Sequence, residues 1–431
     1  MSVKKFYKLG KTELFKICRS ITGDGVRKTL KIYRRHFANL KIREVLSGTK
    51  VFDWKVPPEW NVRDAYVIDN SNKKIIDFKK NNLHLVSYSI PVKKVLKKVD
   101  FLKHLHSLPK QPKAIPYVTS YYKKHWGFCV ADKKKKLFEK KYKKSDKFRI
   151  VINSSFKKKG HLTYGELIIP GKSKKEILIS TYICHPSMAN NELSGSIVSL
   201  SLINFFRRKK PDKTLRFIFI PETIGSITYI YKNLDYLKNN IIGGYNLSCI
   251  GDDRNHSCVL SKYGDSLSDK SLIKAYKKLK IKFTRYSYLQ RGSDERQFNY
   301  PGVDLPIATI CRSKFGEYPE YHTSLDDFDL VTEKGVYGGF KVAKEAINNL
   351  QKKIIPKSLT ICEPKLSNKG LHKDISIKSG YNYRGFTKSL LSFLQYSDGT
   401  NDIDEISKFL RIKKKQTKKL YQILKSKKLV E

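Results

Sequence analysis

The sequence predicts an α/β protein with a mainly parallel sheet, a small β-rich insertion and a helical unit near the C-terminal end. From about 167 to 352, apolar runs of strand length alternate with helical stretches, which is typical of a parallel sheet covered on both faces. Residues 51–164 carry short alternating runs broken by prolines, and 365–431 carry three short helical patterns. A chain of 431 residues is long enough for two or three domains.

Composition narrows the class of protein. With 40% hydrophobic and 12% aromatic residues the chain has enough apolar surface to fold, and it contains no run of about eighteen apolar residues that would predict a membrane span. The segment Met1–Lys5 lacks the apolar region of a signal peptide. Seven cysteines without paired spacing fit reduced thiols. We therefore predict a cytoplasmic protein and leave its oligomeric state open.

The formal net charge of +49 points toward a nucleic-acid or anionic-surface partner. However, the lysines are spread over every segment instead of forming one stripe, and the chain is rich in Ile and Asn as well. Coding in an A- and T-rich genome explains that combination. Charge alone therefore does not predict nucleic-acid binding as the main role.

The order of the elements follows from the apolar patterns. The first 50 residues are predicted to be helical, with a turn at 22–25. In the insertion, the lysine-rich runs between 133 and 144 indicate the solvated surface of a hairpin. In the α/β region, buried strands are predicted at 177–184, 215–220, 244–250 and 307–311, and helices at 195–210, 226–238, 272–279 and 333–352.

Two histidines stand where an α/β sheet places its chemistry. His185 follows the first buried strand and precedes a helix, and open α/β sheets bind ligands at this end of their strands. His322 lies in the polar loop 317–324. Neutral imidazole at a strand end is a standard zinc ligand, and catalytic zinc usually takes three protein ligands and water. Taken singly, each histidine fits a hydrogen-bonded structural role better than a metal site.

Other polar groups flank the same strand ends. Glu222 ends the next buried strand, where a carboxylate can take a proton from water, but by itself it also fits a glutamate that satisfies a helix dipole. Cys184 is interpreted as a buried strand cysteine that points away from His185. The charged loop 292–297 either holds a substrate amine or carboxylate or forms a surface ion-pair network. The same two interpretations apply to the charged segment 251–254.

The last segment is predicted to form a separate unit. Three apolar faces within 365–431 predict three short helices in lysine-rich sequence, a pattern typical of a winged-helix-like module. The same pattern fits contact with DNA and docking of a protein equally well.

Seven motifs spread over nearly the whole chain carry a family resemblance. They are CRSITGDGVR (18–27), SGTKVFDW (47–54), YVTSYY (117–122), CHPSMANNELSG (184–195), PETIGS (221–226), GSDERQ (292–297) and EYHTSLDD (320–327). With them the sequence resembles the zinc aminopeptidase superfamily, and within it a bacterial group of aminopeptidase-like proteins, some of them encoded beside surface-polysaccharide genes. The resemblance implies a phosphorylase/hydrolase-like zinc-peptidase core of residues 1–50 plus 165–360, an inserted β-rich domain at 51–164 and a winged-helix-like domain at 365–431.

The metal-ligand positions of that superfamily are only partly kept. Its pattern has a His after a strand, an Asp-x-x-Ser-Gly loop, a Glu-Glu pair, an Asp after the next strand and a late His. Here Asn191 stands at the bridging Asp, Thr223 at the second Glu and Ser248 at the later Asp. The resemblance therefore implies one zinc ion per chain instead of two.

The remaining positions imply a set of ligands and a base. His185 and His322 match the first and last histidine ligands, and Glu192 or Asn191 is expected to complete the set. Glu222 matches the general base, which activates water against an amide carbonyl.

We predict from this a zinc-dependent, aminopeptidase-like amide hydrolase that acts on a peptide or another small amide. Arg291, Asp294 or Glu295 is expected to hold the substrate, and Tyr321 to line the site. One alternative is a hydrolase of a modified sugar or sugar conjugate in surface-polysaccharide synthesis. Another is a degenerate peptidase fold that acts as a binding or regulatory module, with a protein or nucleic-acid partner of its winged helix.

Overall fold

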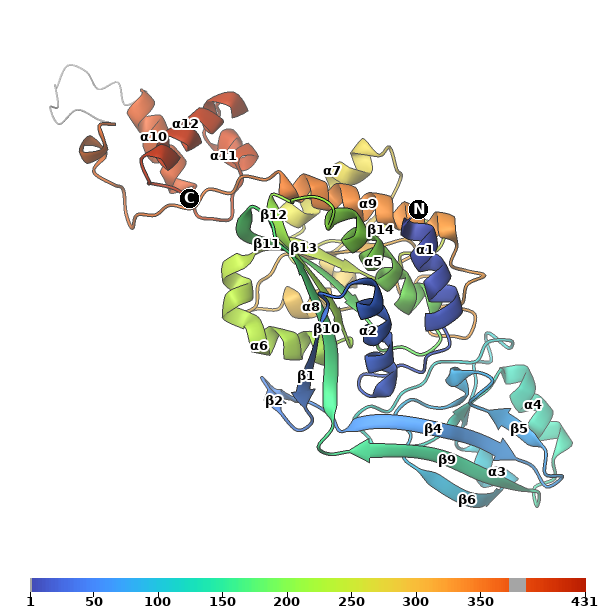
Figure 1. The fold of residues 1–431 in the computed structure, drawn as a ribbon. Helices are drawn as coiled ribbons and strands as arrows, with labels where there is room; N and C mark the ends of the chain where they lie inside the picture. Colours follow the sequence, from blue (N-terminus) through green and yellow to red (C-terminus); the bar gives the residue numbers. More distant parts are fainter. Residues whose placement is uncertain (1, 372–384) are drawn as a thin grey trace. The chain divides into compact units, whose positions relative to one another are not determined.

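The computed structural model describes residues 2–371 and 385–431 (Figure 1). The chain divides into two compact units, one reaching Leu350 and the other running from Gln351 to Glu431. No helix within the described residues has the length and apolar character needed to cross a membrane.

A mixed eight-stranded sheet forms the centre of the first unit. Its strands are β1 (Lys41–Leu46), β10 (His161–Ile169), β11 (Ser173–Tyr182), β12 (Lys213–Ile220), β13 (Ile241–Leu247), β14 (Ser257–Val259), β15 (Thr284–Tyr286) and β16 (Ile307–Cys311). They lie in the order β1-β10-β12-β11-β13-β16-β14-β15, and the central strands β12, β11, β13 and β16 are parallel. The predicted α/β class with a mainly parallel sheet is confirmed.

Helices cover both faces of this sheet, which is why its central strands are apolar on both sides. They are α1 (Ser2–Leu9), α2 (Asp24–His36), α5 (Ser194–Phe206), α6 (Ile224–Asn240), α7 (Leu267–Lys278), α8 (Glu295–Phe298) and α9 (Glu333–Gln351). In Figure 1, α2 and α5 lie on one side of the sheet and α6 on the other. Phe219 packs on Tyr33 of α2 with ring centroids 5.0 Å apart, whereas Tyr164 packs on Tyr229 of α6 at 5.5 Å.

The first 50 residues are not wholly helical, and this part of the prediction was wrong. Residues 41–46 form β1, which pairs antiparallel with β10 at the edge of the sheet. Most of its side chains are exposed or half-buried, with Val45 the only buried one. An edge strand of this kind lacks the alternating apolar pattern by which strands are predicted.

A second, antiparallel sheet lies between β1 and β10 in the sequence. Its order is β5-β4-β9-β6. Beside it are two helices and two short strand pairs (Figure 1). The elements are β2 (Lys50–Val51), β3 (Trp54–Lys55), β4 (Glu59–Ile68), β5 (Lys74–Asp77), β6 (Val92–Lys97), α3 (Lys98–Leu102), β7 (Leu105–His106), β8 (Phe128–Cys129), α4 (Asp132–Lys141) and β9 (Lys147–Lys157).

The lysine-rich segment of this insertion is a helix over most of its length, so the predicted hairpin was wrong there. α4 begins at Asp132, an acidic residue that suits a helix N-terminus, and it buries Phe138. Lysine favours helix over strand when it is exposed, so a run of lysines around one buried aromatic residue is compatible with a surface helix.

The described residues of the C-terminal unit include the three predicted α-helices, α10 (Phe386–Gln395), α11 (Ile403–Phe409) and α12 (Lys414–Ser426). They share an apolar core that includes Leu390, Phe393, Ile406 and Leu424. Isolated bridges join Lys357 to Asp398 and Ser358 to Val430, so strand-like segments lie against the helices.

One buried carboxylate connects α2 to both sheets of the first unit. Glu59 at the start of β4 accepts hydrogen bonds from Arg27 Nη1 and Nη2 at 3.0 and 2.6 Å and from the His161 amide at 2.9 Å. Burial opposes the charged form, but these bonds and the bond from Asn61 lower the pKa of Glu59 to about 2. The charged carboxylate is therefore a structural element of the native state.

We expect Glu59→Gln to lower the free energy of unfolding by about 1–3 kcal/mol at pH 7, because the half-buried Arg27 guanidinium loses its buried charged partner. The depressed pKa of Glu59 stabilises the fold above the unfolded value near 4.5 and stops doing so as the pH falls toward 2. The difference between wild type and variant should therefore shrink between about pH 5 and pH 2. Denaturant unfolding at several pH values measures it, with exposed Glu139→Gln as the matched control; a pH-independent difference would contradict the charge argument.

Candidate active site

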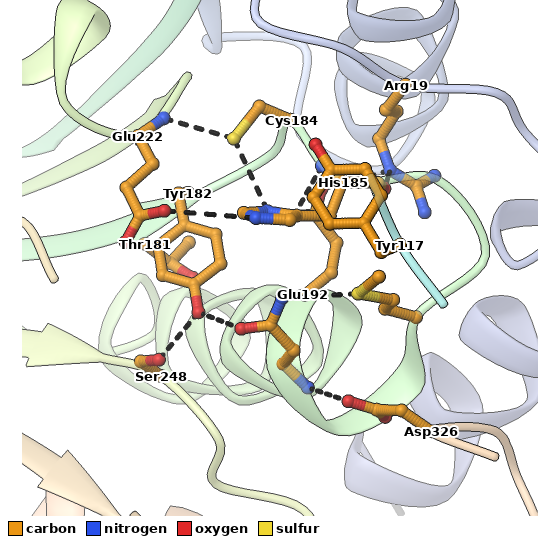
Figure 2. A network of polar contacts seen from close by, with 12 residues as sticks. Arg19, Tyr117, Thr181, Tyr182, Cys184, His185, Glu192, Glu222, Ser248 and Asp326 are labelled. Carbon is orange, nitrogen blue, oxygen red and sulfur yellow. Dashed lines mark hydrogen bonds and ion pairs between the residues drawn. The ribbon is translucent and has the colours of Figure 1, made fainter. Parts of the chain in front are cut away.

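His185 lies in the loop between β11 and α5 and is held by its own loop. Oε2 of Glu192 accepts a hydrogen bond from the His185 amide at 2.9 Å and lies 3.1 Å from Nδ1 of the ring. Oε1 of Glu192 accepts from Nε of Arg19 at 3.0 Å, and the same Nε donates to the carbonyl of His185 at 3.1 Å. Both oxygens of Glu192 are therefore engaged, and the other ring nitrogen of His185, Nε2, faces Glu222 (Figure 2).

The charges around His185 favour its protonated form. Burial lowers the pKa of His185, but the hydrogen bond and charge of Glu192 and the charge of Glu222 outweigh it, so the pKa is raised above its ordinary value. The ring is therefore readily charged when no cation lies beside it.

Glu222 follows β12 and precedes α6, as the sequence predicts. Its Oε2 lies 3.8 Å from Nε2 of His185. Burial raises the pKa of Glu222, against the lowering effects of His185 and Arg296. The amide of Glu222 donates to Sγ of Cys184 at 3.2 Å. A carboxyl with a raised pKa at the end of a parallel strand is a suitable proton acceptor.

Cys184 is buried as predicted, but it does not point away from His185. Its Sγ lies 3.4 Å from Nδ1 of His185, because β11 ends at Tyr182 and strand alternation does not continue to these residues. Burial raises the pKa of Cys184 well above its ordinary value, so the group is a neutral thiol.

His322 comes to the same place from a distant loop. Its ring centroid lies 5.2 Å from that of His185, and it stacks on Tyr321 at 4.0 Å. Nε2 of His322 is buried without a hydrogen-bond partner, and burial together with His185 lowers its pKa to about 3. A neutral imidazole with an unpartnered nitrogen is available to bind a ligand.

The insertion contributes a side chain to this site. The ring of Tyr117 lies 5.2 Å from His185 and 5.3 Å from His322 between centroids, and its hydroxyl bonds to that of Tyr121. The Tyr117 amide donates to the carbonyl of His322 at 2.8 Å. This bond fixes a backbone position that is costly for a residue other than Gly, since His322 has a φ of +57°.

Neutral, hydrogen-bonded side chains stand at the positions where the superfamily has acidic ligands. The hydroxyl of Tyr182 lies 2.6 Å from Oδ1 of Asn191 and 2.8 Å from Oγ of Ser248 (Figure 2). Oγ1 of Thr223 accepts from Nη2 of Arg296 at 2.6 Å. These side chains are satisfied by one another, so they offer little to a second metal ion.

The predicted substrate-holding residues of the 292–297 region lie in different surroundings. Glu295 is fully buried, and Oε1 accepts from two backbone amides while Oε2 accepts from Thr309 at 2.9 Å. Asp294 is also buried and accepts from the Thr223 amide at 2.8 Å, but its Oδ2 has no partner. Burial and the charge of Glu222 raise the pKa of Asp294 to about 7. Arg291 is exposed.

We tested which residues fit a zinc ion. Among residues 2–371 and 385–431, ligand atoms of three His, Cys, Asp or Glu side chains come within 4.8 Å of one another only at Cys184, His185 and Glu192. Hydrogen bonds account for that cluster, because Glu192 binds Arg19 and His185 and Cys184 is a neutral thiol. The two imidazoles of His185 and His322 are the donors whose chemistry fits zinc at this site.

Sequence reasoning missed Arg19, Tyr117, Tyr182 and Arg296 as parts of this site. Three of them lie inside motifs that carried the family resemblance: 18–27, 117–122 and 292–297. These motifs were therefore the sequence signal for the missed residues, although the spacing of the motifs did not show that the segments meet in the fold.

Comparison with known proteins supports the fold and the family. Residues 7–353 match a family described as a domain of unknown function (DUF4910), and 354–431 match a winged helix-turn-helix. A Clostridium acetobutylicum protein is 41% identical over 407 residues, covering 93% of this chain and 91% of its own. It is named as a candidate polysaccharide biosynthesis protein with an aminopeptidase-like domain.

Solved structures show the same architecture. The crystal structure of a candidate peptidase from C. acetobutylicum is 38% identical, with a TM-score of 0.79 and coverage of 100% of this chain and 96% of the other. A zinc aminopeptidase from Bacillus subtilis shares the fold at 14% identity, with a TM-score of 0.59 and coverage of 80% and 94%. From its sequence matches, its fold and the arrangement of its histidines, the chain belongs to this bacterial aminopeptidase-like family, with a C-terminal winged helix-turn-helix.

Proposed function

We propose that the chain is an amide hydrolase of aminopeptidase type, acting on a peptide or another small amide, with Glu222 as its general base. The position of Glu222 carries the proposal: its carboxylate lies 3.8 Å from Nε2 of His185, at the carboxyl ends of parallel strands. Its raised pKa suits a group that takes a proton from water and returns it to the leaving amine.

The proposal includes one zinc ion per chain, which His185 and His322 would hold. When bound, zinc supplies Lewis acidity, which lowers the pKa of water and polarises a carbonyl group. Glu192 orients His185 through Nδ1 in this proposal instead of acting as a third ligand, since both of its oxygens are engaged. Asn191 stays with Tyr182.

The proposed substrate-binding residues are chosen by which polar atoms of the site have no hydrogen-bond partner and which side chains line it. Asp294 has a buried oxygen without a partner, which favours it over Glu295 for holding a substrate amine. Tyr321 would line the site by its stacking on His322, and Tyr117 would close it from the insertion. Arg291 is exposed and would act only on a part of the substrate that extends from the site.

Replacing Glu222 by Gln keeps the shape of the side chain but removes its basicity. Hydrolysis of the best substrate in a panel of aminoacyl and N-acyl-sugar amides should fall by about 10²–10⁴-fold. Zinc content should remain that of the wild type, because Glu222 is not a proposed ligand. The exposed Glu333→Gln variant is the matched control, and retained activity in Glu222→Gln would contradict the general-base role.

Elemental analysis of the purified protein, after zinc is supplied, tests the metal. We expect about one zinc per chain, and His185→Ala and His322→Ala should each lose it. His161→Ala, which removes an imidazole outside the site, should keep it. A protein without bound zinc would contradict this part of the proposal and favour the degenerate, binding-module alternative.

The sugar-conjugate form of the function has its own support. The relative that is 41% identical is named for polysaccharide biosynthesis. We therefore propose a sugar-linked amide as the substrate class to test beside peptides. Preferred hydrolysis of N-acyl sugars over aminoacyl amides in the same panel supports this form, and the reverse preference contradicts it.

A second candidate function belongs to the C-terminal unit. Residues 354–431 match a winged helix-turn-helix, and Lys415, Lys418 and Lys419 are exposed on its last helix, α12. Helices of this kind bind DNA through phosphate and base-edge contacts. We propose duplex DNA as the partner of this unit, with a protein partner as the competing outcome.

Changing Lys415, Lys418 and Lys419 together to Glu should weaken binding of labelled duplex DNA by about tenfold or more, and should reduce the slope of log affinity against log salt by about one per lost phosphate contact. The matched control changes three exposed lysines of β6, Lys93, Lys94 and Lys97, to Glu with the same loss of charge. An equal effect in the control would show that the binding follows net charge and not α12.

A further inference from the structure

A cavity of about 610 Å³ lies beside the hairpin formed by β2 and β3. Its lining combines residues 53–58 with Gly48, Tyr122 and Lys158, so it draws on three separate stretches of the chain. The volume falls in the range of small-molecule binding sites. None of its lining residues belongs to the candidate active site.

Two aromatic rings line this cavity and remain partly open to solvent. Trp54 is 40% and Tyr122 56% exposed, and their ring centroids lie 5.8 Å apart in an edge-to-face arrangement. The other two tryptophans of the chain, Trp60 and Trp126, are buried. Large aromatic side chains left exposed in a concave surface mark a binding site, because folding alone favours their burial.

The charged groups of the cavity are also unsatisfied. Lys55 and Lys158 are exposed and form no ion pair with any residue in the described ranges, and the same holds for Asp53. Two cations and one carboxylate leave a net positive charge beside the aromatic rings. A ligand with an apolar face, hydroxyl groups and an anionic group complements this combination.

The walls of the cavity are connected to the candidate active site. Phe52 at the tip of the hairpin packs on Tyr231 of α6 at 5.3 Å between centroids, and α6 begins two residues after Glu222. Tyr122 follows Tyr121, whose hydroxyl bonds to Tyr117 of the active site. The hairpin beside the cavity therefore contacts α6, and the segment that supplies Tyr122 also supplies Tyr117 to the candidate active site.

We propose that this cavity binds an acidic sugar residue, whose apolar face packs against Trp54 and Tyr122 and whose carboxylate is held by Lys55 and Lys158. A sugar ring has an apolar C–H face and polar edges, which an acidic peptide lacks. This proposal names a substrate class for the sugar-conjugate form of the proposed function. It rests on that function for the identity of the bond that is cleaved. Binding at the cavity does not itself require hydrolysis, so the two proposals can fail separately.

Calorimetric titration of the full-length protein tests the proposal with three acidic tetrasaccharides of different linkage: tetragalacturonate, a hyaluronan tetrasaccharide and tetrasialic acid. At least one should bind and should change the fluorescence of Trp54, the exposed tryptophan. Trp54→Ala and Tyr122→Ala should each weaken binding by about tenfold. Tyr263→Ala, which removes a tyrosine that is 82% exposed elsewhere, should leave the affinity unchanged.

Two further comparisons distinguish the contribution of the sugar ring to binding from the contribution of its negative charge. Lys158→Ala should weaken binding of the acidic tetrasaccharide, but Lys147→Ala, at an exposed position on β9, should not. Neutral maltotetraose should bind at least about tenfold more weakly than the acidic sugar. The proposal is overturned if none of the three acidic sugars binds, if Trp54→Ala binds as the wild type does, or if tetra-aspartate binds with equal affinity. The last outcome would assign the cavity to acidic peptides.

Discussion

The buried carboxylate of Glu192 is the interaction on which the candidate site depends. A charge removed from water is costly unless it is paired and hydrogen-bonded, and here Arg19 and His185 supply the pairing. Because Arg19 comes from the first 50 residues and His185 from the end of β11, the N-terminal segment has to pack on this loop for the charge to be satisfied. The same bonds engage Nδ1 of His185, and they leave Nε2 as the nitrogen directed at Glu222.

The neutral residues at 191, 223 and 248 also lower the electrostatic cost of this buried site. Several carboxylates at close range repel one another unless a cation lies between them. With Asn191, Thr223 and Ser248 that repulsion is absent, and Tyr182 and Arg296 complete the hydrogen bonds. These three positions therefore need no cation to relieve repulsion between carboxylates. Glu192 is already paired with Arg19 and His185, whereas burial favours the protonated forms of Glu222 and Asp294 by raising their pKa values.

The parts of the structure that could be predicted from the sequence are those that short-range patterns of apolar and polar residues encode. Apolar runs located the central strands, and strand ends located His185 and Glu222. β1 could not be found in this way, because an exposed edge strand has no apolar alternation. The pairing of Arg19 with Glu192 joins residues 173 positions apart, and no local pattern encodes such a contact. The contacts of Glu192 with Arg19 and His185 were missed for this reason, and its role as a metal ligand stays a prediction of the family resemblance.

Local sequence patterns also did not predict that the insertion contributes Tyr117 to the candidate site. A peptidase core alone would leave His185 and His322 open on the side where Tyr117 now lies. The Tyr117 amide also holds the backbone of His322 in its strained conformation, so the insertion and the second histidine are positioned together. The segment that begins with Tyr117 ends with Tyr122 in the aromatic cavity. In the proposed function, the insertion therefore selects the substrate and the core supplies the groups that move the proton.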